Sequence, residues 1–70
     1  MDELESLRAD LAAARHEYYR TLDRYQARDA WALAGDARAK LRSEMLSAHE
    51  RYSRAQDRLH EALARRRHAT

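Results

Sequence analysis

The sequence predicts an all-α protein, folded as a two-helix antiparallel hairpin, on three observations. Helix-favouring residues dominate the composition, since fifteen Ala, nine Leu and thirteen Arg stand against a single Gly and no Pro, Val, Ile or Phe. Apolar residues recur with a helical period along most of the chain. The single glycine, Gly35, stands at the midpoint, where a chain that doubles back needs its turn. We therefore expect one helical-hairpin domain over residues 1–70.

The first predicted helix covers about residues 2–33. It begins with acidic residues, among them Asp2 and Glu3, which suit the positive end of a helix dipole. Leu11, Leu22 and Leu33 are spaced by eleven residues, a repeat that predicts a nearly straight helix rather than a strong left-handed supercoil. The large apolar residues of this half are Leu4, Leu7, Leu11, Tyr18, Leu22, Tyr25 and Leu33.

The second predicted helix covers about residues 36–67. Gly is favoured just past a helix C-terminus and Asp is a favoured N-cap, so we place the turn near Gly35-Asp36. The apolar residues alternate steps of four and three, which is a heptad seam. They are Leu41, Met45, Ala48, Tyr52, Ala55, Leu59 and Ala62. Pairs spaced i,i+4 predict intrahelical ion pairs on the exposed surface, namely Lys40–Glu44, Glu50–Arg54 and Glu61–Arg65.

Folding the chain back at Gly35 pairs residues whose numbers add up to 70 and places the acidic start beside Arg65-Arg66-Arg67. The predicted hairpin seam consists of Leu7, Leu11, Tyr18, Leu22, Tyr25, Leu41, Met45, Tyr52, Leu59 and Leu63. A one-heptad slip, to numbers adding up to 63, also pairs apolar residues but puts the turn near Trp31, where nothing favours one. One alternative stays open: a continuous helix in an antiparallel coiled coil forms the same pairs, because a lone Gly costs a helix only about 1 kcal/mol.

Apolar residues outside the seam predict a second interface. A chain this short buries a modest fraction of its surface and often needs a partner to be stable. Tyr19, Trp31 and Leu46 fall off the seam, and we expect them at a partner or dimer interface. Two hairpins pairing as a homodimer would form an antiparallel four-helix bundle. The leading functional hypothesis is a small non-enzymatic protein–protein interaction module, an adaptor, small chaperone or inhibitor, acting by helix-face docking and self-association.

No pattern in the sequence predicts catalysis, a metal site or a cofactor. There is no cysteine, no Gly-rich phosphate loop and no Ser-His-acid spacing typical of a nucleophilic site. Of the four histidines, only His60 has a carboxylate at ligand spacing on its own helix, Asp57. We interpret the histidines as solvated surface residues and predict that the protein is not an enzyme.

Arg65, Arg66 and Arg67 form the one run of like charge. As contacts to phosphate groups they would make this a nucleic-acid-associated protein, whereas as cations ending a helix they complement its dipole. Because 14 basic residues stand against 12 acidic ones, nucleic acid is the second functional hypothesis rather than the first. A third is a structural component of a larger assembly, such as a phage particle or secretion machine. The acidic start and the lack of a long apolar stretch predict a cytoplasmic protein with no membrane segment.

Overall fold

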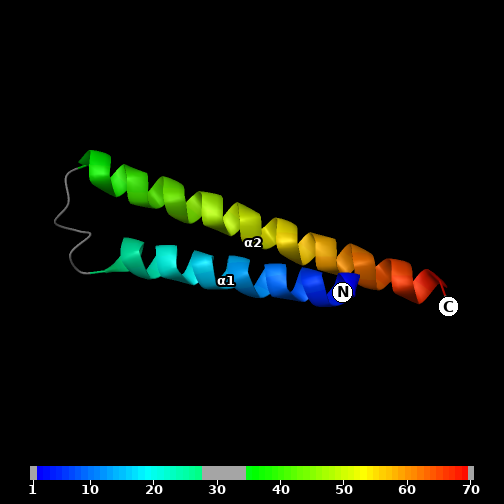
Figure 1. Cartoon of the computed structure of the whole chain (residues 1–70). Helices are drawn as coiled ribbons and strands as arrows, with labels where there is room; N and C mark the ends of the chain where they lie inside the picture. The colour runs from blue at the N-terminus through cyan, green and yellow to red at the C-terminus, as the bar shows by residue number, and fades with distance from the viewer. Residues whose placement is uncertain (1, 28–34, 70) are drawn as a thin grey trace.

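The computed structural model describes residues 2–27 and 35–69, which form an antiparallel pair of helices, α1 (Glu3–Gln26) and α2 (Gly35–Ala69). The start of α1 and the end of α2 lie toward one end of the hairpin, and the end of α1 and the start of α2 lie at the other (Figure 1). The described ranges contain no strand. The predicted all-α helical hairpin is confirmed, and the alternative of one continuous helix is wrong, because the two helices pack against each other within a single chain.

Helix α1 begins where the sequence predicts and ends earlier. Asp2 is the N-cap, and its Oδ1 accepts a hydrogen bond of 3.3 Å from the backbone N–H of Leu4. The helix ends at Gln26, because Ala27 is extended with ψ of 145°. The prediction that it continues to about residue 33 is therefore wrong. The next heptad position after Tyr25 is Arg28, so a longer helix would bring an arginine onto the seam. Residues 28–33 themselves lie outside the described ranges.

Helix α2 begins at Gly35, so the reversal of the chain lies near Gly35-Asp36, as predicted. Gly35 does not have the positive φ of the predicted C-terminal cap. A Cβ added to Gly35 would meet no atom within 4 Å. The prediction that this glycine caps the first helix is therefore wrong, and no close approach of other atoms requires a glycine here. The predicted extent of about 36–67 differs from the observed helix by one or two residues at each end.

The buried face of each helix follows a heptad spacing of three and four residues. In α1, Ala14 and Thr21 fill the steps between the large apolar residues, so the buried face of this half also follows a heptad. The seam of α1 consists of Leu4, Leu7, Leu11, Ala14, Tyr18, Thr21 and Tyr25, and all are buried or half-buried. The α2 heptad residues predicted from sequence, 41 to 62, are likewise buried or half-buried, as are all ten residues of the predicted seam.

Alanines are the most buried residues of α2. Ala48 is 1% exposed, and Ala55 and Ala62 are buried with it on every second seam position. Alanine contributes little apolar area, but its small side chain lets a neighbouring helix approach closely. The contact between the helices therefore depends on larger side chains of α1, such as Leu4, which packs with Ala62 and Leu59 in the core cluster.

Ion pairs between the helices fix the register. Glu3–Arg65 (3.0 Å), Glu17–Arg51 (2.6 Å) and Arg24–Glu44 (3.4 Å) all join residues whose numbers add up to 68, within two of the predicted 70. The one-heptad slip is thereby excluded. The rings of Tyr18 and Tyr52, a predicted pair, have centroids 5.8 Å apart.

Two of the three predicted i,i+4 ion pairs are wrong. Glu50 pairs with Arg54 as expected. Glu44 and Arg65 pair instead across the hairpin, with Arg24 and Glu3. The reason is their heptad position, which faces the other helix.

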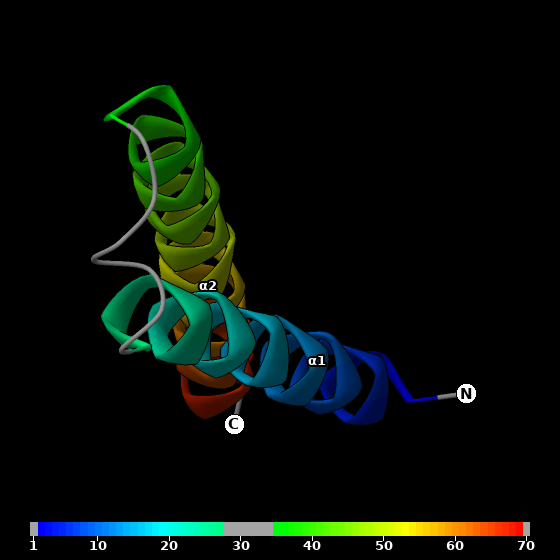
Figure 2. The ribbon, with the colours of Figure 1, turned by 90° about the vertical axis from the view of Figure 1, so that its left-hand side faces the viewer.

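The hydrophobic core is thin and lies toward the chain ends. Its buried members are Leu4, Leu59 and Ala62, and Leu7, Leu11 and Leu63 pack against them. The helices lie close together at this end and diverge toward the connection (Figures 1 and 2). The radius of gyration is 16.1 Å, against about 11 Å expected for a compact chain of this length. The hairpin is therefore an elongated rod with two long sides open to solvent.

Candidate interaction surface

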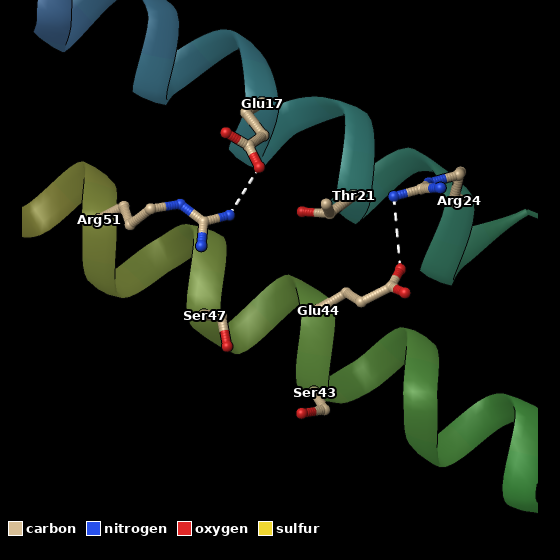
Figure 3. A pocket seen from close by; sticks show the side chains of 7 residues that line it. All are labelled: Glu17, Thr21, Arg24, Ser43, Glu44, Ser47 and Arg51. Atoms are coloured by element: carbon tan, nitrogen blue, oxygen red, sulfur yellow. Dashed lines mark hydrogen bonds and ion pairs between the residues drawn. The ribbon is translucent and has the colours of Figure 1, made fainter.

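Charged residues line one side of the seam from end to end. With the seam at heptad positions a and d, the g positions of two antiparallel helices face each other. In α1 these are Glu3, Asp10, Glu17 and Arg24, and in α2 they are Arg65, Arg58, Arg51 and Glu44. Three of these four facing pairs form ion pairs, two of which are drawn in Figure 3. We call these eight residues the ionic flank.

A polar cleft of about 300 Å³ opens on the ionic flank where the helices diverge. Its lining consists of Glu17, Thr21, Arg24, Ser43, Glu44, Ser47 and Arg51 (Figure 3). Its two acids and two arginines pair with one another, so the charges cancel. The hydroxyl of Thr21 donates to the backbone carbonyl of Tyr18 at 2.7 Å, which is why a polar residue can be buried on the seam. The four charged side chains and the Thr21 hydroxyl of the cleft therefore all have partners within the chain.

Apolar side chains gather on the opposite side of the seam. Tyr19 and Leu46 are the two large apolar residues that stay exposed among those described, at 51% and 54%. Each directly follows a seam residue, Tyr18 or Met45, and so occupies the equivalent b position of its helix. The b and e positions of two antiparallel helices lie on one side of the pair. Leu22, half-buried, holds an e position between them. We call Tyr19, Leu22 and Leu46 the apolar flank.

An aromatic cluster joins the apolar flank to the seam. The ring of Tyr18 lies 5.7 Å from that of Tyr19, 5.1 Å from the imidazole of His49 in an edge-on arrangement, and against Tyr52. Such contacts hold aromatic rings in fixed positions. The ring of Tyr19 is thus held by its contact with Tyr18, while about half of its surface remains exposed to solvent. The sequence predicted Tyr18, Tyr19 and Tyr52, but His49 was missed, because it is an exposed residue and was interpreted as a solvated one with no role in packing.

The third residue predicted for the interface, Trp31, lies outside the described residues. The structure describes the other two, Tyr19 and Leu46. Residues that face each other across the helices, such as the ion pairs, have numbers that add up to 68. Tyr19 and Leu46 add up to 65, so they lie at nearly the same height along the rod. They therefore belong to a single surface rather than to two separate ones.

The arginines of the C-terminal run face the acidic start of the chain. Arg65 pairs with Glu3 at 3.0 Å and Arg66 with Asp2 at 3.5 Å. Arg67 also makes an interaction. Because two of the three guanidinium groups already have carboxylate partners, this end presents less free positive charge than the sequence alone indicates.

Two further features bear on site chemistry. Within residues 2–27 and 35–69, no three His, Cys, Asp or Glu side chains come together at metal-ligand distance. Over the same ranges, neither helix has a stretch long and apolar enough to cross a membrane.

We compared the chain with protein-family models, curated proteins and solved structures. None of them matches it.

Proposed function

We propose that this protein is a small, non-enzymatic protein–protein interaction module, an adaptor, small chaperone or inhibitor, that docks through one face of its helical hairpin. The observation that carries the proposal is the apolar flank, where Tyr19 and Leu46 lie exposed on the same side of both helices. Exposed apolar residues grouped on one face are typical of interaction sites, and tyrosine is enriched among the residues that dominate binding energy.

The exposed area supports the proposal. The accessible surface is 5627 Å², whereas a compact monomer of this mass exposes about 4,500 Å². The excess is about 1,100 Å², and each partner in a standard interface buries about 800 Å². The surface that the rod leaves open is therefore large enough for one ordinary interface.

The thin core supports it as well. Among the described residues, no large side chain is completely buried, and much of the seam is half-buried. Chains of this size commonly gain their remaining stability from association. A partner on the apolar flank would complete the burial of Leu22 and the aromatic cluster. That partner is either another protein or a second copy, which would give the four-helix bundle of a homodimer.

Site-specific photo-crosslinking, in the cell that makes the protein, tests this proposal. A photoreactive phenylalanine analogue replaces Leu46 in one variant and the neighbouring Ser47, which lines the polar cleft, in the control. We expect a discrete crosslinked product from position 46 and none from position 47. In parallel, light scattering measures the oligomeric state, and thermal unfolding measures the stability, of the purified chain and of its Tyr19→Ala and Leu46→Ala variants. The proposal fails if position 46 gives no product and the chain is a stable monomer unaffected by both substitutions.

A further inference from the structure

The charges that border the apolar flank indicate what kind of partner it fits. Arg8 and Arg15 are the two e positions of α1 before Leu22. Arg42 is the e position of α2 one heptad before His49. All three arginines are exposed. Their spacing puts them on the same side of the rod as Tyr19 and Leu46, with Arg8 and Arg15 before Tyr19 along α1 and Arg42 before Leu46 along α2.

Unlike Arg24, Arg51 and Arg65 of the ionic flank, these three arginines have no carboxylate partner among the described residues. The ion pairs of the structure involve Arg24, Arg51, Arg54, Arg65 and Arg66 instead. Within the described part of the chain, the b and e positions carry one acidic residue, Glu5, against Arg8, Arg15, Arg42 and Arg67. The apolar flank is therefore an apolar centre with a positively charged border.

This border distinguishes between the possible occupants. A second copy docked through the same flank would bring two sets of arginines together, and like charges facing each other are unfavourable. An amphipathic helix with acidic residues beside its apolar stripe would supply the missing carboxylates. Arginine is well suited to this, because its planar guanidinium pairs with a carboxylate through two hydrogen bonds.

We propose that the apolar flank binds an acidic amphipathic helix of another protein. The apolar stripe of that helix packs on Tyr19, Leu22 and Leu46, and its carboxylates pair with Arg8, Arg15 and Arg42. The complex is a three-helix arrangement in which the partner helix lies along the apolar flank, against both α1 and α2. This inference rests on the proposed function and specifies its partner.

Two synthetic peptides test the inference. Both carry leucine at heptad positions a and d; the acidic probe has glutamate at its other exposed positions and the basic probe has lysine. Titration calorimetry against the full chain measures the affinity for each. We expect the acidic probe to bind and the basic probe not to, and we expect the binding to weaken as salt is raised. Tyr19→Ala and Leu46→Ala each weaken it, because the apolar centre is part of the site.

A matched pair of double variants distinguishes specific binding through the arginine border from nonspecific electrostatic attraction between the acidic probe and a basic chain. Arg15→Glu with Arg42→Glu reverses two charges on the border. Arg20→Glu with Lys40→Glu reverses two exposed charges at c positions, on the other side of the rod, that have no ion-pair partner in the described residues. We expect the border variant to lose about tenfold or more in affinity and the control to change by less than about threefold. Circular dichroism verifies that both fold.

Several results would overturn the inference. They are equal weakening by both double variants, absence of binding by the acidic probe, preference for the basic probe, and crosslinking of position 46 to a second copy of the chain. The last of these would leave the proposed function standing, with a homodimer in place of a foreign helix. The proposed function itself is refuted only by a separate result, namely that position 46 gives no crosslinked product and the chain is a stable monomer unaffected by Tyr19→Ala and Leu46→Ala.

Discussion

Two leucines of α2 provide a direct test of which surface holds the hairpin together. Leu59 is 9% exposed and belongs to the core cluster with Leu4 and Ala62, whereas Leu46 is 54% exposed on the apolar flank. Leu59→Ala and Leu46→Ala make the same chemical change, in the same helix, with equal gains in helix propensity. Any difference between them in the free energy of unfolding therefore reports packing.

The size of that difference follows from the burial. Truncating a buried leucine to alanine costs about 2–5 kcal/mol, and the low end applies here, because the helices can close around a gap in so thin a core. We expect Leu59→Ala to lose about 2–3 kcal/mol, which for a domain of this length lowers the melting temperature by about 10–20 °C. Leu46→Ala removes few contacts within the chain, so its loss stays within about 0.5 kcal/mol.

Thermal and urea unfolding, followed by helical circular dichroism on dilute protein, measures both values. Equal losses in the two variants, independent of concentration, would refute the placement of the core at Leu59. A loss for Leu46→Ala that grows with protein concentration would instead show that a second copy covers this leucine in solution.

Three further substitutions test individual contacts by the same unfolding measurements. Gly35→Ala should be neutral or stabilise by up to about 1 kcal/mol, because Gly35 begins α2 with open space around it, whereas a turn glycine of positive φ would lose stability. Asp2→Ala should cost about 1 kcal/mol through loss of the N-cap to α1, and Asp2→Asn, which keeps a capping oxygen, should cost less. Glu17→Arg and Arg51→Glu should each destabilise, and the double exchange should recover most of the loss, with a coupling of about 0.2–1 kcal/mol that falls as salt is added; zero coupling would contradict the ion pair.

The fold class could be predicted because composition and periodicity both favour helices and because the two halves match when folded together. The register was nearly correct for the same reason, since the pairing of Tyr18 with Tyr52 depends on residues far apart in the chain that share a periodic pattern. The seam of α1 was harder to predict. Ala14 and Thr21 are too small or too polar to count as apolar signals, so the heptad was hidden behind an accidental spacing of eleven among the leucines.

The local role of Gly35 was predicted wrongly because it rested on a single residue. Gly35 was assigned the cap of the first helix from the usual role of glycine past a helix end, but it is the first residue of α2. The end of α1 at Gln26 has no local stop signal, although the next heptad position after Tyr25 is the charged Arg28. The exposed residues Tyr19 and Leu46 could be found from the sequence, because each follows directly after a seam residue. The positive border could not, since it becomes visible only once both helices are aligned.

Along the ionic flank, the helix that supplies the acid of each ion pair changes once, and this change restricts how the two helices can align. The acids at Glu3 and Glu17 belong to α1, whereas in the pair nearest the connection the acid is Glu44 of α2 and the base is Arg24 of α1. Sliding the helices by one heptad one way opposes Glu17 with Glu44, and sliding them the other way opposes Arg24 with Arg51. Each shift costs an attraction and adds a repulsion. The reversed pair Arg24–Glu44 therefore favours the observed alignment over both shifted ones. The alanines Ala48, Ala55 and Ala62, which repeat every seven residues along α2, contribute little to this choice because a one-heptad shift replaces one alanine with another.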